Sequence, residues 1–355
     1  MARAASSGIV GPNMAEPTLP AGSLLRLRQD PAQPQPSLST RDLALELRAR
    51  LRDPALDFDE GDLADQLGAL GLEIETRTES PRNRLSRTRV AAIAEMLAKD
   101  VASGALRLDG ATVVDLGCGS IHPLGPSLLH VLGGARRAIG IDMDPPQDPA
   151  LATRALLRLA LACLAAPEHV IPWTRRTRAD VVAALDGFDL AKLWLGDPAG
   201  IDDRRLRLHH GPAERMPFAD GEIDACTSVS FLEHVADVDA VLAELARVVR
   251  PGGIVVHAID GVDHASYGDA AVGPLDFLRE PYADGRALVG GCNRLRPVEF
   301  VARFEQAGFT AVEFEVHARI PVDDTLRAGF AEPWRSMATA ALAEVQGAIR
   351  ARRRG

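Results

Sequence analysis

Residues 111–144 constrain the fold of this chain more than any other stretch. They read as an apolar run that ends in Asp115, a glycine-rich turn, a segment of helix length, and a second apolar run that ends in Asp142. A strand, a glycine turn, a helix and a second strand that ends in an acid form the mononucleotide-binding half of a doubly wound α/β sheet. The sequence therefore predicts an α/β protein whose ligand lies at the carboxyl ends of parallel strands.

The residues of the glycine turn distinguish between classes of nucleotide ligand. A dinucleotide fingerprint would place a third glycine at position 122, where this chain has His122. Asp115 precedes Gly117 by two residues, and its charge would repel a pyrophosphate but attract a cationic ligand. S-adenosylmethionine (SAM) carries an ammonium and a sulfonium and no phosphate, so it fits this turn better than NAD. Gly117 and Gly119 let the backbone approach its amino-acid tail, and Asp142 can accept hydrogen bonds from the two ribose hydroxyls.

Several motifs in order along the chain then resemble the class I SAM-dependent methyltransferases. Residues 113–120, VVDLGCGS, match the first motif of that family, and residues 140–144, GIDMD, match the second. The resemblance continues through HGPAERMPF at 210–218, DGEIDA at 220–225, FLEHV at 231–235 and LAELARVVRPGG at 242–253. It implies a Rossmann-like fold with a seven-stranded, mostly parallel sheet and helices on both faces. A helical N-terminal extension and a helical insertion after the second strand are expected additions.

The resemblance also implies SAM as the cofactor and assigns residues to it. The cofactor-binding residues predicted in this way are Asp115, Gly117, Cys118, Gly119, Asp142, Met143, Ala213, Glu214 and Ser230. One position departs from the family pattern, since Pro212 stands where an acid usually hydrogen-bonds the adenine amino group. The Ala213 amide and Glu214 are therefore expected to recognise the adenine in its place.

Polar residues that follow the fourth and fifth predicted strands supply the candidates for catalysis. Methyl transfer is an in-line displacement that needs alignment of donor and acceptor, and a hydroxyl acceptor also needs a base. His264 is the preferred base, with Asp260 or Asp263 to orient it, and His234 is a further candidate. As alternatives, His264 only caps its loop, His234 only packs, or Asp260, Asp263 and His264 bind a divalent metal. The prediction assigns no metal ligand.

A looser resemblance concerns the acceptor. HAIDGVDH at 257–264 and NRLR at 293–296 resemble methyltransferases of surface-polysaccharide and glycosylated-metabolite pathways. This implies a small polar acceptor, with O-methylation of a sugar or glycosylated metabolite as the leading hypothesis. Asn293 and Arg294 either hold that acceptor or anchor a loop. N- or C-methylation in specialised metabolism is the first alternative, and a non-catalytic SAM-binding protein, favoured by Pro212, is the second.

Composition excludes some partners. The net charge of −9 argues against nucleic acid as a partner. The four cysteines, Cys118, Cys163, Cys226 and Cys292, form no C-x-x-C pair, so neither a zinc site nor a disulfide framework is predicted. The longest apolar run, 156–166, is too short to span a bilayer. The expected protein is cytoplasmic, without a membrane or nucleic-acid partner, and acts on a small molecule; its oligomeric state stays open, with a homodimer as one alternative.

Three regions are expected along the chain. Residues 1–38, rich in Ala, Pro, Ser and Gln, are predicted to be a disordered tail, and residues 39–107 a helical cap. Residues 108–355 are predicted to form the SAM-binding domain. Its insertion at 145–205 is expected to hold two amphipathic helices that form a lid, a wall of the acceptor site or a purely structural pair.

The C-terminal end of that domain has two predicted elements. Residues 310–320 alternate between apolar and polar side chains and are expected to form the antiparallel edge of the sheet. Residues 334–353 form an amphipathic pattern, with several alanines and a basic end, and are expected to form a last helix.

Overall fold

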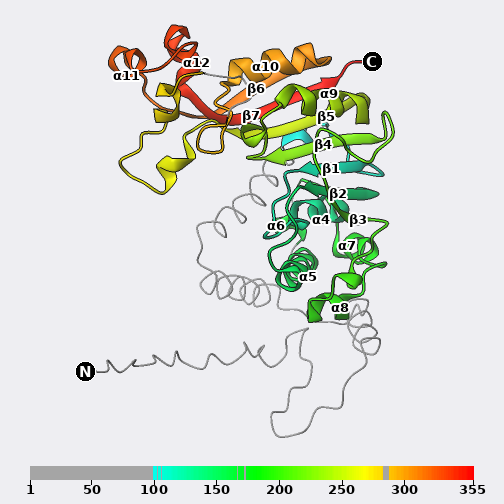
Figure 1. Ribbon diagram of the computed structural model, residues 1–355. Helices are drawn as coiled ribbons and strands as arrows, with labels where there is room; N and C mark the ends of the chain where they lie inside the picture. Colours follow the sequence, from blue (N-terminus) through cyan, green and yellow to red (C-terminus); the bar gives the residue numbers. More distant parts are fainter. Residues whose placement is uncertain (1–98, 102, 105, 166, 172, 283–287) are drawn as a thin grey trace, which may run out of the picture.

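The computed structural model describes residues 99–101, 103–104, 106–165, 167–171, 173–282 and 288–355 (Figure 1). The tail predicted at 1–38 and most of the cap predicted at 39–107 lie outside the described residues. The described part is built around a mixed seven-stranded sheet with helices on both faces. In this part of the chain, no helix is long and apolar enough to cross a membrane.

The sheet has the strand order β3-β2-β1-β4-β5-β7-β6. Its strands are β1 (Thr112–Leu116), β2 (Arg137–Asp142), β3 (Leu206–His210), β4 (Ile223–Val229), β5 (Val249–Asp260), β6 (Phe309–Arg319) and β7 (Glu344–Arg353). Strands β1 to β5 pair in parallel, whereas β7 runs antiparallel to both β5 and β6. The strand order reverses between β1 and β4, so a ligand crevice is expected beyond the carboxyl ends of these two strands.

Helices connect the strands and cover the two faces of the sheet. They are α4 (Gly125–Leu132), α5 (Pro149–Ala165), α6 (Pro167–Val170), α7 (Arg178–Ala184), α8 (Leu190–Leu195), α9 (Val238–Val248), α10 (Pro297–Gln306), α11 (Asp324–Ala328) and α12 (Thr339–Ala343). Short 3-10 turns are η1 (Pro198–Gly200), η2 (Leu232–His234), η3 (His264–Tyr267), η4 (Asp276–Arg279) and η5 (Trp334–Ser336).

Both faces of the central strands are buried, which explains why their sequences are nearly continuous apolar runs. Val114 of β1 and Ile139 of β2 pack in one cluster with residues of α9 and α10. The neighbouring Val113 points to the other face, where it packs with Ala225 and Val256. Helix α4 contacts the sheet through β1, β2 and β3, and its apolar side chains join those of α5 to α8 in a third cluster.

The insertion at 145–205 contains α5, α6, α7, α8 and η1 and lies beyond the β3 end of the sheet (Figure 1). Helix α7 begins at a capping box, because Thr177 accepts a hydrogen bond from the Asp180 amide and Asp180 accepts one from the Thr177 amide. Helix α8 begins at Asp189 and ends at Gly196, which adopts the left-handed conformation. The insertion is therefore a locally specified helical layer against α4.

The prediction of a C-terminal helix over 334–353 is wrong. Only η5 and the short α12 are helical in that part of the described chain, and β7 replaces the second half of the predicted helix. The side chains of Val345, Ile349 and Ala351 are buried at the two-residue spacing of a strand, and Ala348 on the other face is buried too. The strand inserts between β5 and β6, so tertiary pairing overrides the helix propensity of the alanines. Strand β6 forms the edge predicted at 310–320 and pairs antiparallel with β7.

Two buried histidines make a prediction about acid stability. Burial lowers the pKa of His130 and of His257 to about 3. The unfolded chain binds a proton at each near pH 6.5. Their contribution to stability is therefore complete above pH 6.5 and is lost as the pH falls toward 3, by about 1.4 kcal/mol per pH unit for each histidine. Urea unfolding at several pH values gives the slope of the free energy of unfolding against pH. This slope should be smaller than in the wild type by that amount in His257→Asn, and equal to the wild type in the exposed control His317→Asn. An unchanged slope in His257→Asn would contradict the assignment.

Candidate functional site

The glycine turn after β1 is held by the acid at the end of β2. The Gly119 amide donates to Asp142 Oδ2 at 2.7 Å, and the Asp144 amide donates to Oδ1 at 2.9 Å. The Cys118 amide donates to the Ile141 carbonyl at 3.1 Å. Because each carboxylate oxygen can accept two hydrogen bonds, Asp142 retains an acceptor on each oxygen for two ligand hydroxyls.

The two glycines of the turn have different surroundings. Gly117 has a φ of +59°, and a Cβ at this position would collide with the ring of Phe231. Gly119 has a φ of +76°, and a Cβ there would meet no atom within 4 Å. Gly117 is therefore needed for close packing, while Gly119 faces the open space that a ligand tail requires.

Asp115 lies under this turn and is fully buried. Thr227 Oγ1 lies 3.5 Å from its Oδ1 atom. Burial, and secondarily the Asp115 carboxylate, raise the pKa of the neighbouring Cys226 thiol. The structure thus places the Asp115 carboxyl group beneath the glycine turn.

The remaining predicted cofactor residues surround the same end of the sheet. Met143 follows Asp142 and is 74% exposed, which is unusual for a large apolar side chain. Ala213 is buried, whereas Glu214 and Ser230 are exposed. Ser230 has a φ of +48° and its amide donates to the Ala258 carbonyl, which ties the end of β4 to β5. An exposed methionine beside Asp142 offers an apolar face to a planar ligand.

His264 and Asp260 lie together at the carboxyl end of β5. His264 Nε2 is 3.7 Å from Asp260 Oδ2, which is longer than a hydrogen bond. Burial lowers the pKa of His264 more than the Asp260 charge raises it, so the imidazole is neutral at pH 7. The Asp263 side chain instead caps η3 through the Ala265 amide. Neither predicted acid therefore orients His264 by a direct hydrogen bond.

Two further polar residues at this site were not predicted. Tyr267 donates from its hydroxyl to Asp260 Oδ2 at 2.5 Å. Glu233 is buried and accepts a hydrogen bond from the Asp260 amide. Burial raises the pKa of Glu233 to about 8, so this carboxyl group carries a proton at neutral pH. The FLEHV motif contains Glu233, but nothing local in that motif reveals its contact with β5.

His234 and Cys292 complete this cluster. The rings of His234 and His264 lie 4.8 Å apart by their centroids. The sulfur of the buried Cys292 accepts a hydrogen bond from the His264 backbone amide. Cys292 was not predicted to belong to the site, because it lies in a hairpin turn that is distant from His234 and His264 in the sequence.

Asn293 and Arg294 anchor loops. The Asn293 side-chain amide donates to the carbonyls of Leu232 and Val235 at 2.7 and 2.9 Å. Arg294 is buried, donates to the Phe277 and Glu280 carbonyls, and stacks on Trp334 at 4.6 Å. These contacts explain both residues without an acceptor and fix the Cys292 segment against η2.

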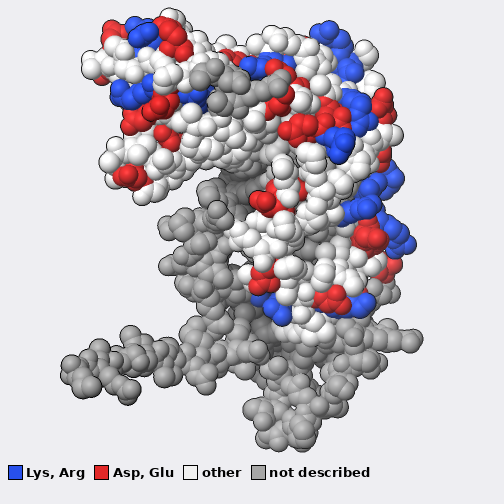
Figure 2. All heavy atoms as spheres, viewed as in Figure 1, with Lys and Arg blue, Asp and Glu red and all other residues white. Residues whose placement is uncertain are grey.

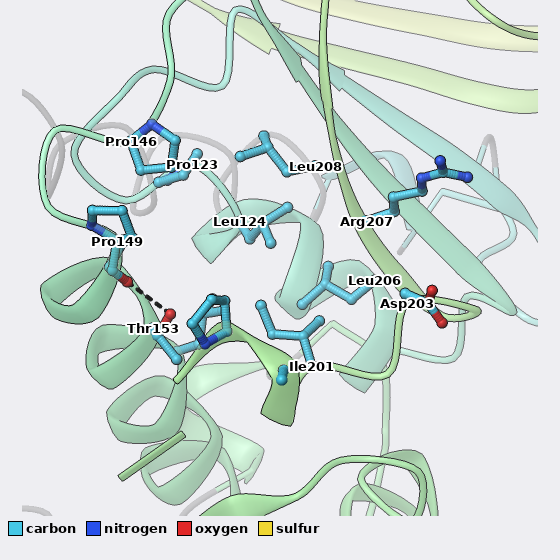
Figure 3. A pocket seen from close by; sticks show the side chains of 14 residues that line it. Pro123, Leu124, Pro146, Pro149, Thr153, Ile201, Asp203, Leu206, Arg207 and Leu208 are labelled. Carbon is cyan, nitrogen blue, oxygen red and sulfur yellow. Dashed lines mark hydrogen bonds between the residues drawn. The ribbon is translucent and has the colours of Figure 1, made fainter. Parts of the chain in front are cut away.

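A cavity of about 500 Å³ lies between the insertion and β3 (Figure 3). Its walls come from the segment before α4, the loop after β2, α5, η1 and β3. The labelled lining residues in Figure 3 are mostly apolar, with Thr153, Asp203 and Arg207 as the polar ones. In the sequence, Pro123 follows the glycine turn and Pro146 follows Asp142, so two residues that line the cavity lie close along the chain to that turn and to the acid that holds it. Its volume lies in the range of small-molecule sites.

Comparison with known families agrees with this topology. The family model described as "Methyltransferase domain" matches residues 174–257. Residues 174–257, less than half of the chain, are thus similar to a methyltransferase domain. The matched segment runs from the insertion through β3 and β4 into β5, and the glycine turn at 117–119 lies outside it. The seven-stranded sheet, whose order reverses between β1 and β4, is the Rossmann-like topology that the sequence predicts.

Sequence relatives match this chain over short stretches. An uncharacterized methyltransferase of Mycobacterium sp. (strain JLS) is 36% identical over 69 residues, which are 16% of this chain and 27% of that protein. A demethylmenaquinone methyltransferase of Parafrankia sp. (strain EAN1pec) is 50% identical over 50 residues, 14% of this chain and 20% of that protein. The chain thus spans about a quarter of the length of the curated relatives it matches.

Among solved structures, a phosphoethanolamine N-methyltransferase 2 of Haemonchus contortus in complex with S-adenosyl-L-methionine is 13% identical. The match covers 74% of this chain and 53% of that one, with a TM-score of 0.40.

Proposed function

We propose that this protein transfers the methyl group of SAM to a hydroxyl oxygen of a small polar acceptor. One observation carries the proposal: the loop from Ser230 to His234 borders both halves of the site. Phe231 packs on Gly117 of the donor turn, and His234 stands against His264. Donor turn and polar cluster are therefore separated by a single short loop, as a direct transfer requires.

In the donor half, the charge of Asp115 lies behind the turn, where it favours the cationic methionine part of SAM. Gly119 leaves room for that tail, Asp142 accepts from the ribose, and Met143 covers the adenine with Ala213 and Glu214 beside it. Cys118 and Ser230 complete the walls through their backbones. The residues present thus match the charge, the hydroxyls and the apolar ring of SAM, and none of them supplies a cradle for phosphate.

In the transfer step, the acceptor oxygen attacks the methyl carbon as the carbon–sulfur bond breaks, and S-adenosylhomocysteine leaves. The acceptor proton passes to His264, whose lowered pKa leaves the imidazole unprotonated, and so able to accept a proton, at pH 7. Asp260, 3.7 Å away, stabilises the imidazolium that forms. His234 borders the same space.

The polar cluster supports a hydroxyl-bearing acceptor, such as a sugar or a glycosylated metabolite of specialised metabolism. Tyr267, Asp260 and Gln346 form a hydrogen-bonded group beside His264, which suits a sugar hydroxyl. The apolar cavity lies against β3, at the opposite end of the row of parallel strands from β5 and the polar cluster. In Figure 2, acidic and basic side chains are interspersed on the face shown, so this face offers no large basic patch to a polyanion. Because the four cysteines are buried and form no disulfide in the described part of the chain, a reducing cytoplasm is the proposed location.

The proposal is tested with methyl-labelled SAM and pools of sugars, glycosides, amines and 2-oxo acids, followed by mass spectrometry. Label on a sugar or glycoside hydroxyl would support it. Label on nitrogen or carbon would leave the fold in place and exclude the hydroxyl mechanism.

Substitution of His264 by alanine should lower turnover by roughly 100-fold or more, the range of general base catalysis. SAM affinity, measured by calorimetry, should stay within about twofold, because His264 does not touch the donor turn. His317→Ala, on the exposed face of β6, is the matched control. Equal losses of turnover and SAM affinity would instead indicate that His264 is structural.

A further inference from the structure

Three side chains with metal-binding atoms meet beside the carboxyl ends of β4 and β5. They are His234, His264 and Cys292, and one ligand atom of each lies within 4.8 Å of the other two. The residues come from η2, from η3 and from the hairpin turn at 289–292. No two of these residues lie on the same helix or strand, so they are brought together by long-range packing.

The histidines have the hydrogen bonds expected of metal ligands. His234 Nδ1 lies 2.9 Å from the Gly291 carbonyl oxygen, so Nδ1 carries the proton and Nε2 the lone pair. Metal-binding histidines usually donate their second ring N–H to such a carbonyl, which fixes the tautomer. His264 Nε2 is buried and has no hydrogen-bond partner. A buried nitrogen without a partner is unfavourable unless something binds it.

Cys292 is positioned by rigid local structure. Gly290 and Gly291 have φ values of +58° and +83°, which a two-residue hairpin turn with both central residues at positive φ requires. Val289 and Cys292 close that turn through paired backbone hydrogen bonds. Asn293 then fixes the segment to η2 through its two bonds to backbone carbonyls. The sulfur is therefore held near both imidazoles rather than placed there by a mobile loop.

The surroundings are negatively charged. Asp260 Oδ2 lies 3.7 Å from His264 Nε2. The carboxylates of Asp260 and Asp263 both interact electrostatically with Cys292. This arrangement stabilises a bound cation.

We propose that His234, His264 and Cys292 bind a zinc ion. A thiolate and two imidazoles suit Zn²⁺, whereas Mg²⁺ and Ca²⁺ prefer oxygen ligands. Tetrahedral zinc with bonds of 2.0 to 2.3 Å separates its ligand atoms by roughly 3.3 to 3.8 Å, so small side-chain rotations close the cluster. On binding, the Cys292 thiol releases its proton to solvent.

Three protein ligands leave a fourth position, and the exposed His234 places it on the solvent side of the cluster. In the zinc-bound protein His264 would ligate the metal, so the general-base step proposed above would apply only to the metal-free protein. Zinc binding itself does not rest on the proposed function.

The test uses the full-length, tag-free protein, purified from zinc-supplemented medium and dialysed. Zinc is measured by plasma mass spectrometry, and its affinity by competition with a chromophoric chelator. The ligand variants are Cys292→Ser and His234→Ala. Because His234 is exposed, its substitution by alanine should not prevent folding. Cys163→Ala and His317→Ala serve as controls for a cysteine and a histidine elsewhere in the chain. Cobalt substitution reports the thiolate through its sulfur-to-metal charge-transfer band.

The expected result is one zinc per chain, resistant to excess Mg²⁺. Each ligand variant should bind zinc at least about 100-fold more weakly, since even loss of an outer hydrogen bond to a ligand lowers affinity by 10 to 100-fold. The cobalt charge-transfer band should vanish in Cys292→Ser and persist in both controls. Zinc well below one equivalent, or equal affinity in His234→Ala and wild type, would overturn the site. SAM binding, measured separately, decides the proposed function independently of this outcome.

Discussion

Replacement of Asp142 by alanine is expected to weaken SAM binding by roughly 100-fold. The carboxylate keeps one free acceptor position on each oxygen after it binds the Gly119 and Asp144 amides. Two ribose hydroxyls would use these positions, and each hydrogen bond to a charged group contributes about 1.5 kcal/mol or more. The variant also leaves the Gly119 amide without its partner and so loosens the donor turn. Isothermal titration calorimetry on cofactor-stripped protein measures the effect.

Asp144→Ala is the matched control, because only the backbone amide of Asp144 takes part in the turn. It lies in the same motif and removes the same charge, but its affinity for SAM should stay within about twofold of wild type. Asp142→Asn should fall between the two, since it retains the shape and only one acceptor oxygen. Equal affinities in Asp142→Ala and Asp144→Ala would show that the ribose binds elsewhere.

The donor turn could be predicted because its information is local. Gly117, Gly119 and Asp142 lie within one strand–turn–helix–strand unit, and each residue type answers a requirement of backbone geometry or charge. The same holds for the five parallel strands, whose apolar runs are bounded by turns. Direct contacts within such a unit follow from the order of the residues alone.

The polar cluster could be predicted only in part. His264 and Asp260 follow β5 directly, so their proximity could be inferred. Cys292 and Glu233 reach the same place through long-range contacts, in which Asn293 binds the η2 carbonyls and the Asp260 amide binds Glu233. No local pattern encodes those contacts. The absence of a C-x-x-C pair led to the prediction that the chain has no zinc site. That argument does not apply to a site whose ligands come from three separate segments.

In the C-terminal segment, Gly347 distinguishes between a helix and a strand. The alanines of 334–353 favour a helix, and this preference led to the wrong prediction. Gly347 argues against it, because glycine weakens a helix interior. In the structure Gly347 lies on β7 where the Glu315 carbonyl and the Phe314 ring of β6 approach the backbone closely. The glycine is therefore required by the pairing of β6 with β7.

Gly347→Ala is accordingly expected to lower the free energy of unfolding by roughly 3 kcal/mol, the upper range for overpacking. Its Cβ would lie 2.6 Å from ring atoms of Phe314 and closer still to the Glu315 carbonyl oxygen, so β6 must shift away from β7. A helix over this segment would give the opposite sign, because alanine stabilises a helix interior by about 0.5 to 1 kcal/mol relative to glycine. Urea unfolding curves of the variant and the wild type measure the difference through their midpoints.

Gly268→Ala is the matched control for this substitution. Gly268 has a φ of −111°, and a Cβ there would meet its nearest atom at 3.9 Å, so its stability should change by less than about 0.5 kcal/mol. A loss in Gly347→Ala beside a neutral Gly268→Ala would locate the effect in the β6–β7 contact. A higher free energy of unfolding in Gly347→Ala would instead support a helix over this segment. It would argue against the strand that separates β5 from the edge of the sheet. Since Gln346 of the same strand binds Asp260, that outcome would also withdraw one support of the polar cluster.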